Sequence, residues 1–403
     1  MTLEQKFKDL AAENAPGQEG RKTEIDLAAL RRGGPILGDV VDFSHGDVDA
    51  FPPTPAAFDA WSQGFAAGGQ QAYTEYRGSA PIRERLAQRL GTFTGKAVDG
   101  EDGMIVTPGT QGALFLALGA TVTTGTKVAV VEPDYFANRK LVRFFNGDVV
   151  PIQLTYDENS TQRGPDLSQL EEAFHSGVEV MVFSTPNNPT GLVYSGDVIE
   201  RIATLAATHN VTLIVDQLYS RLLYRGERYA HLRSCDVVPD NLITIMGPSK
   251  TESLSGFRLG VAFGTPALIT RMERLQALVS LRAAGYNQAV LDTWFCEPDG
   301  WITDRIAQHT AIRDDLLGIF RARGLVTATP QAGSYLFPRL PKLAVAPNAF
   351  VSLLRDQADV TVTLGDEFGP TSADSIRLNF SQDHDTACDA AKRLVAMVER
   401  YQA

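Results

Sequence analysis

The segment EVMVFSTPNNPTGLVYSGDVIERIATLAATHNVTLIVDQ, residues 179–217, contains the repeating unit that decides the fold. A short apolar run at 180–183 is followed by a polar loop, then by a helical pattern at 198–209, and then by a second apolar run at 211–215. This order of strand, helix and strand is typical of a mostly parallel sheet with helices on its faces. The strands are apolar throughout, which indicates that both faces of the sheet are covered.

The same alternation extends over residues 100–265. Further apolar runs are MIVT, KVAVV and LITIM, and each run in the series ends in a polar or glycine-rich loop: TPGTQG, EPDY, TPNNPTG, DQLY and GPSK. Ligands bind at the carboxyl ends of the strands in such sheets. The sequence therefore predicts that these five loops converge on one edge.

Longer amphipathic helical patterns and a mixed α/β tail follow residue 265. We predict an α/β fold with a mostly parallel central sheet flanked by helices, and a smaller α/β domain formed by the N- and C-terminal parts. The expected division is an N-terminal arm and part of the small domain at 1–50, a large ligand-binding domain at 51–290, and a C-terminal small domain at 291–403.

The composition narrows the possible partners. The chain has 403 residues, a formal net charge of −11, and 44% hydrophobic against 21% charged residues, which is a normal globular balance. Nucleic acid and anionic membranes need a concentrated basic surface, so neither is expected as a partner. The start of the chain lacks signal-peptide features, and no apolar run approaches the ~20 residues of a membrane helix. We therefore expect a cytoplasmic protein.

The chain has three cysteines, at 235, 296 and 388. They are odd in number and far apart, and no CxxC or cysteine and histidine spacing for a metal is evident. We expect reduced, structural thiols and no metal site.

The first loop, TPGTQG, combines a strand end, a tight turn and a helix start. The backbone at Gly109, Thr110 and Gln111 could direct amides at a phosphate from the positive end of that helix. The GxxxxGK[ST] and GxGxxG patterns are absent. Taken alone, this loop is equally an ordinary helix cap.

The next loops offer groups suited to a planar polar ligand. Tyr135 could lie flat against a ring, and the amide of Asn188, in a loop made rigid by two prolines, could bond a ligand oxygen. Asp216 ends a fully apolar strand and so needs a cationic or hydrogen-bonding partner, which Tyr219 could share. Taken separately, Tyr135 also fits an aromatic residue at the rim of the sheet, and Asn188 fits an ordinary surface turn. Asp216 also fits a cap of the helix that follows it.

The last loop, GPSKTESLSGFRLG at 247–260, contains Lys250 and Arg258. A lysine in a partly desolvated loop can act as a Schiff-base nucleophile, and the arginine fork suits a phosphate. Either residue alone would more simply be a solvated surface charge. Together with the other loops, they indicate a planar ligand that carries a phosphate, a protonated ring nitrogen and an aldehyde, which describes pyridoxal 5′-phosphate.

The ordered motifs NNPTG, DQLY, SKTESLSGFRLG and SIRLNF resemble those of the fold-type-I pyridoxal-phosphate enzymes, most closely the aspartate aminotransferase family (class I/II aminotransferases). The resemblance covers nearly the whole chain. It implies that Lys250 binds the cofactor as a Schiff base and moves the substrate α-proton, and that Asp216 keeps the ring nitrogen protonated. It also implies that Asn188 and Tyr219 bond the ring oxygen.

The remaining roles follow from the same resemblance. Tyr135 would stack on the ring, and the phosphate would be held by Thr110, Gln111 and Arg258. Arg377 in SIRLNF would clamp the substrate carboxylate, with Gly46 in a substrate-side loop. Tyr73, five residues before Gly78, would reach the phosphate of a neighbouring subunit, which implies a homodimer with shared active sites.

Some positions depart from the family pattern. Gly247 stands where a serine commonly touches the phosphate, Pro248 is unusual, and Ser249 is a possible substitute for the missing hydroxyl. Gln217 replaces a common acidic residue. Arg282 is a candidate for a distal substrate carboxylate, although a surface arginine at a helix end fits equally well.

The resulting hypothesis is an aminotransferase that exchanges an amino group between an amino acid and a 2-oxo acid by a ping-pong mechanism. The same scaffold supports a lyase, decarboxylase, racemase or amino-acid oxidase. A non-catalytic effector-binding module is a further alternative. The amino donor and acceptor are not specified by the sequence.

Overall fold

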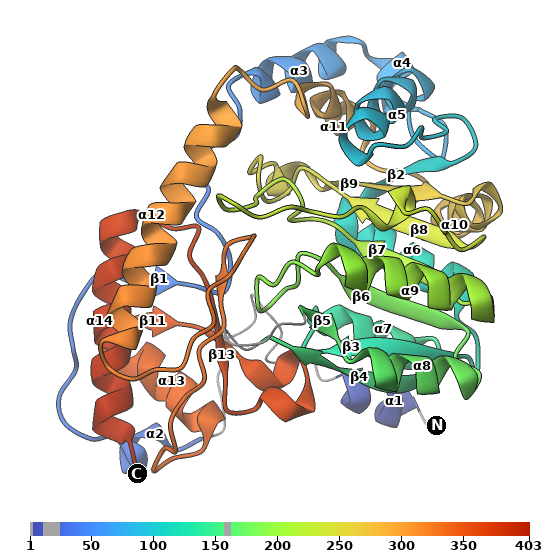
Figure 1. Ribbon diagram of the computed structural model, residues 1–403. Helices are drawn as coiled ribbons and strands as arrows, with labels where there is room; N and C mark the ends of the chain where they lie inside the picture. Colours follow the sequence, from blue (N-terminus) through green and yellow to red (C-terminus); the bar gives the residue numbers. More distant parts are fainter. Residues whose placement is uncertain (1–2, 11–24, 157–162) are drawn as a thin grey trace.

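The computed structural model describes residues 3–10, 25–156 and 163–403, and an eight-stranded sheet lies at its centre (Figure 1). In spatial order the strands are β2 (Met104–Pro108), β9 (Leu259–Gly264), β8 (Leu242–Met246), β7 (Thr212–Asp216), β6 (Val180–Ser184), β3 (Lys127–Glu132), β4 (Asp148–Thr155) and β5 (Gly164–Pro165). Strands β8 to β4 of this order are mutually parallel. Strand β9 is antiparallel to both of its neighbours, and β5 is antiparallel to β4. The predicted mostly parallel sheet is confirmed.

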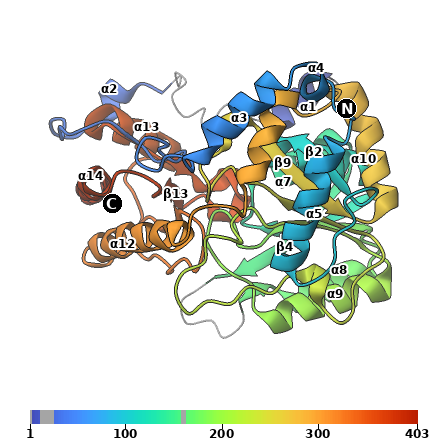
Figure 2. The same ribbon diagram turned by 90° about the horizontal axis from the view of Figure 1, so that it is seen from above.

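Alternate side chains of the central strands enter two separate cores. On β6, Met181 and Phe183 join one core, whereas Val180 and Val182 join the other. The helices of the first core are α8 (Leu167–His175) and α9 (Gly196–His209), and those of the second are α6 (Gly109–Thr121), α7 (Phe136–Phe144) and α10 (Pro266–Val279). Figure 2 shows α8 and α9 on one side of the sheet and α10 on the other. Burial on both faces explains why these strands lack polar alternation.

A further core lies at the β2 end of the sheet. Its large buried side chains include Leu86, Leu90, Phe263 and Trp294. The elements there are α3 (Ala56–Ala66), α4 (Gly69–Ala72), α5 (Ala80–Thr94), α11 (Gly285–Gln288) and η3 (Ala289–Thr293). Helix α1 (Leu3–Leu10) lies apart from this group, with the Lys6 amine 4.1 Å from the ring centre of Phe144 on α7.

The second body combines both ends of the chain. Strand β1 (Val41–Asp42) pairs with β11 (Val360–Thr361), and a separate sheet has the order β10 (Tyr335–Leu336), β13 (Ile376–Asn379) and β12 (Thr363–Leu364). The helices are α2 (Leu27–Leu30), α12 (Trp301–Arg321), α13 (Pro347–Ala358) and α14 (His384–Tyr401). Figure 1 shows α12 and α14 side by side, with α12 extending toward α3.

One core unites this second body, with Val41, Phe43 and Phe51 packed among residues from 312 to 401. Phe51, which belongs to this core, lies beyond the expected boundary at residue 50. The short 3₁₀ turns of the chain are η1 (Leu232–Ser234), η2 (Ser255–Phe257), η4 (Gly365–Glu367) and η5 (Pro370–Ser372).

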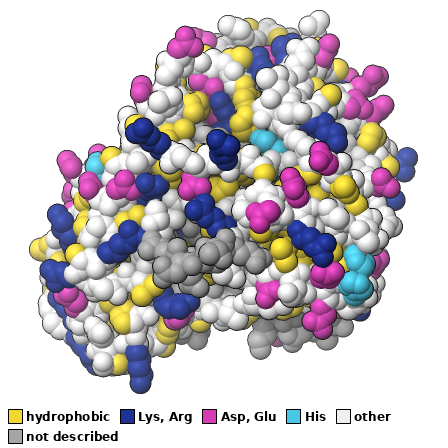
Figure 3. All heavy atoms as spheres, in the orientation of Figure 1, with side chains coloured by type: hydrophobic (Ala, Val, Ile, Leu, Met, Phe, Trp, Pro, Cys, Tyr) yellow, Lys and Arg dark blue, Asp and Glu magenta, His cyan; other side chains and the backbone are white. Residues whose placement is uncertain are grey.

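On the molecular face shown in Figure 3, acidic and basic side chains are interspersed. The three cysteines are free thiols. Among the described helices, none combines the length and the apolar character that crossing a membrane requires.

Candidate active site

A cavity of about 440 Å³ lies where the carboxyl ends of the parallel strands meet the second body. All five loops singled out in the sequence contribute to its wall, so their predicted convergence is observed. The predicted residues that line it are Thr110, Gln111, Tyr135, Asn188, Asp216, Tyr219, Ser249, Lys250, Arg258 and Arg377. The second body adds Ser44, His45 and Tyr335, which the sequence analysis did not identify.

At one end of the cavity, the start of a helix lies beside an arginine. Helix α6 begins at Gly109, and its N-cap residue Pro108 provides no side-chain hydrogen bond, which leaves the first amides available. Arg258 precedes β9, and since β9 runs antiparallel to β2, the arginine lies beside the start of α6. A Cβ atom at Gly109 would lie 2.6 Å from Arg258 Nη2, so the glycine makes room for the guanidinium. Helix dipole and guanidinium thus direct positive charge at the same place.

Close packing explains the departure at Gly247. A Cβ atom there would lie 2.8 Å from Thr110 Cγ2 and 3.2 Å from the Leu259 carbonyl oxygen. The side chain of Thr110 therefore occupies the space that a larger residue at 247 would need. Ser249 lies in the cavity wall, and its hydroxyl is 3.4 Å from the Leu259 carbonyl oxygen.

We expect Gly247→Ser to lower the free energy of unfolding by about 1–3 kcal/mol, because the added atoms must displace Thr110 or the backbone of β9. Chemical denaturation measures the change. Gly256→Ser is the matched control, since a Cβ atom at Gly256 meets no atom within 4 Å. Equal stability of the two variants would contradict the steric explanation.

Asp216 is the last residue of β7, Lys250 follows the adjacent parallel strand β8, and both line the cavity. Burial raises the pKa of Asp216 to about 6, against the opposing effect of the Leu218 amide, whose nitrogen lies 3.0 Å from Asp216 Oδ1. A cation bound in the cavity would stabilise the ionised form of this carboxylate.

A second buried carboxyl group, that of Asp134, lies behind the cavity wall. Burial raises the pKa of Asp134 to about 8, although the hydroxyl and backbone amide of Ser184 and the amide of Tyr135 all donate to it. Ser184 lines the cavity. In the sequence, Asp134 could have been identified by its position in EPDY, a loop that directly follows an apolar strand.

Tyr135 stands at the start of α7, and its hydroxyl donates to Gln111 Oε1 at 2.8 Å. This bond fixes the ring at the cavity wall. Burial raises the pKa of Tyr135, so the phenol keeps its proton at neutral pH.

Arg377 on β13 is 2% exposed. It donates to Asn188 Oδ1 at 3.1 Å and to the Ser44 carbonyl oxygen at 2.8 Å, and its guanidinium lies 4.4 Å from the ring centre of Tyr335. Its Nε atom has no partner among the described residues, and no carboxylate within the described ranges pairs with it. A buried arginine in this state is suited to bind an incoming carboxylate.

The Tyr219 side chain meets Tyr335 rather than standing alone. Their hydroxyl oxygens are 2.6 Å apart, and Tyr335 comes from β10 of the second body. Gln217, the other departure in DQLY, is fully buried and points at His231, with 3.0 Å between its Oε1 and the His231 Nδ1.

Four residues named from the family pattern lie away from the cavity in this chain. Tyr73 is 82% exposed, and Arg282 stacks against Tyr73 and donates to the Thr74 carbonyl oxygen. Gly78 has a φ of 102° and packs on Val106. Gly46 lies in the wall of a neighbouring cavity of about 550 Å³, which also touches Lys250.

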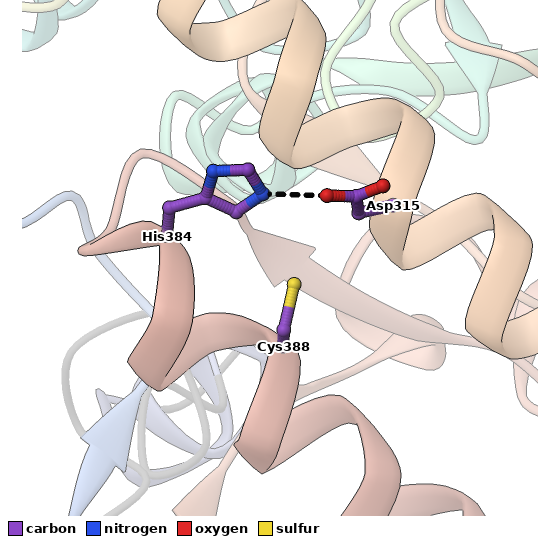
Figure 4. A group of neighbouring side chains, drawn as sticks. All are labelled: Asp315, His384 and Cys388. Carbon is purple, nitrogen blue, oxygen red and sulfur yellow. Dashed lines mark hydrogen bonds and ion pairs between the residues drawn. The ribbon is translucent and has the colours of Figure 1, made fainter.

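The expectation of no cysteine and histidine metal spacing overlooked one group. His384 and Cys388 are four residues apart on α14, and with Asp315 on α12 their ligand atoms all lie within 4.8 Å of one another (Figure 4). Figure 4 shows His384 directed at Asp315, with 2.8 Å between Nε2 and Oδ2. The three residues are not among those that line the cavity. The pair of Asp315 and His384 ties α12 to α14.

The fold and site together define an α/β enzyme with one cavity that is lined by a lysine, the start of a helix and a buried arginine. The family model "Aminotransferase class I and II" matches residues 38–394, and the chain belongs to this family. It is therefore an enzyme of amino-group transfer.

Several relatives extend this comparison. A crystal structure titled as an aspartate aminotransferase from Rhodobacter sphaeroides is 61% identical, with a TM-score of 0.95 and 100% of each chain covered. The aspartate/prephenate aminotransferase of Thermus thermophilus is 28% identical over 96% of this chain and 95% of its own length. The arginine–pyruvate transaminase of Pseudomonas aeruginosa is 26% identical over 91% of each.

Proposed function

We propose that this aminotransferase uses pyridoxal 5′-phosphate and transfers the amino group of an α-amino acid to a 2-oxo acid in two half-reactions. The observation that carries the proposal is the placement of Lys250 and Asp216 in one cavity with the anion-binding start of α6. Free cysteines support a cytoplasmic location.

The residues fit this cofactor. The uncapped amides of α6 and Arg258 suit its phosphate, and the half-buried Asp216 suits its ring nitrogen as a cation. Pyridoxal 5′-phosphate supplies, when bound, an electron-withdrawing ring that stabilises negative charge at the substrate Cα atom. Tyr135 presents an aromatic face at the cavity wall, and Asn188 and Tyr219 present polar groups.

Three side chains of the cavity, those of Lys250, Arg377 and Asp216, have separate roles in the proposed reaction. The Lys250 amine would hold the cofactor, and its Nζ atom would take and return the substrate α-proton. Arg377 holds the α-carboxylate through its fork and so orients the Cα–H bond toward the lysine. The ionised Asp216 would keep the ring nitrogen of the cofactor protonated, because the carboxylate and the protonated nitrogen stabilise each other.

We further propose a homodimer with shared active sites. Tyr73 is 82% exposed and does not line the cavity of its own chain. Arg282 lies 5.6 Å from the ring centre of Tyr73 and 5.3 Å from that of Tyr76. The exposed apolar side chains on α3 and near the end of α10 are Phe58, Phe65, Leu278, Val279 and Leu281. A second copy of the chain would cover this surface and receive Tyr73.

The half-reaction tests the proposed function. Purified protein given an amino acid and no acceptor is expected to release one 2-oxo acid per site and to lose the visible absorbance of lysine-bound cofactor, which a 2-oxo acid then restores. Aspartate is the first donor to test, because of the 61% identical relative. Continuous release of ammonia or carbon dioxide would instead indicate a lyase, oxidase or decarboxylase. Absence of both absorbance and turnover would indicate a binding module.

A further inference from the structure

Tyr335 is hydrogen-bonded to Tyr219, the tyrosine whose hydroxyl we place at the ring oxygen of the cofactor. Its hydroxyl oxygen lies 2.6 Å from that of Tyr219, and the two rings meet edge to face with 5.3 Å between centroids. Each side chain is 3% exposed, and both line the cavity. Nothing in the sequence marked Tyr335, whose neighbours in GSYLFP are ordinary core residues.

The pair shares one hydrogen bond but carries two protons. A hydroxyl has one donor hydrogen, so one of the two protons lies between the oxygens and the other points elsewhere. Within the described ranges neither hydroxyl has another partner, and both open onto the cavity. The second proton is therefore available to a ligand bound there.

The surrounding charges decide which hydroxyl donates within the pair. Burial, the largest influence, raises the pKa of Tyr335, but the nearby cations Lys250 and Arg377 and the bond to Tyr219 outweigh it and leave that pKa below its ordinary value. Burial raises the pKa of Tyr219 well above its ordinary value. The more acidic phenol is the better donor. The titratable and charged groups that face the pair are Lys250 after β8, Arg377 on β13, Asp216 on β7 and Tyr135 at the start of α7.

We infer that Tyr335 is a positioning residue that donates its hydroxyl proton to Tyr219 and thereby directs the Tyr219 proton at the ring oxygen of the cofactor. The inference rests on the proposed function. A hydroxyl that accepts one hydrogen bond becomes a stronger donor in the next, so Tyr335 strengthens the contact that Tyr219 makes. A stronger contact withdraws negative charge from the ring oxygen and makes the Lys250 nitrogen attached to the cofactor lose its proton at lower pH.

The test is a pH titration of the visible spectrum of the purified holoenzyme. Tyr335→Phe keeps the ring beneath Arg377 but removes the donor. We expect this variant to raise the midpoint of the titration by about 0.5 pH unit. A shift of this size corresponds to part of the free energy of one neutral hydrogen bond. Tyr219→Phe is expected to raise the midpoint further, and in that background Tyr335→Phe is expected to have no additional effect.

Tyr224→Phe is the matched control, because Tyr224 is a buried tyrosine whose hydroxyl donates to the Gly333 carbonyl oxygen without lining the cavity. Its midpoint should equal that of the unaltered enzyme. An unchanged or lowered midpoint in Tyr335→Phe, or an equal shift in the Tyr219→Phe background, would overturn the inference. Failure of the proposed function is distinguishable, since the unaltered protein would then bind no cofactor and give no visible band.

Discussion

Lys250→Ala is expected to abolish both the visible absorbance of the lysine-bound cofactor and turnover, with kcat lower by roughly 10⁴-fold or more. Lys250 is the lysine that lines the cavity, so no other amine of the described chain is placed to replace it there. The alanine leaves the anion site at α6 and Arg258 in place. The variant should therefore still bind the cofactor, without attachment.

Lys392→Ala serves as the control, because Lys392 is an exposed lysine on α14. Absorbance spectra and steady-state rates of the two variants give the comparison. If Lys250→Ala kept the band or the turnover of the control, the assignment of this lysine would be wrong.

The same variant tests the shared active site. In a mixed dimer of Lys250→Ala and Tyr73→Ala chains, one of the two sites would contain an intact Lys250 from one subunit and an intact Tyr73 from the other. Random mixing should therefore restore about a quarter of the wild-type sites. Activity of the mixture that never exceeds the average of the two separate variants would contradict the exchange of Tyr73 between subunits.

Arg377→Lys is expected to lower kcat/KM by roughly 10²- to 10³-fold, mainly through a higher KM. Lysine keeps the charge but loses the two-pronged contact with a carboxylate, and it also loses the bonds to Asn188 and Ser44. Complete removal of one partner of a buried charge pair costs about 2–5 kcal/mol, which is the upper limit for a change that keeps the charge.

The spectrum of the bound cofactor separates this effect from misfolding, since the band should persist in Arg377→Lys. Arg339→Lys is the control, because Arg339 is a half-exposed arginine nearby that pairs with Asp374. A KM close to that of the control would show that another group holds the substrate carboxylate.

The sequence was sufficient to predict the sheet and the convergence of its loops, because both follow from local patterns. Apolar runs such as VMVF and TLIV bury both faces, and their carboxyl ends must share an edge. That rule singled out Lys250 and Asp216 as candidates, and the combined loops and the family resemblance supplied their expected roles. The position of Arg258 beside the start of α6 could not be predicted in this way. It depends on the antiparallel direction of β9, which no local sequence pattern indicates.

The residues that were missed come from contacts distant in sequence. Tyr335 and Ser44 reach the cavity only because the second body packs against the sheet edge, and a tyrosine among core residues carries no sign of that. Gly247 was noticed as a departure, but its cause, the side chain of Thr110, lies more than a hundred residues away. Asp134 was quoted within its motif without a role, because its partner Ser184 belongs to another strand.

The hydrogen bond between Arg377 and Asn188 joins the second body to a loop of the central sheet. Groups that would carry the chemistry come from one body, and the arginine that would recognise the substrate comes from the other. The orientation of a bound substrate over the reacting groups would therefore depend on how the two bodies pack against each other.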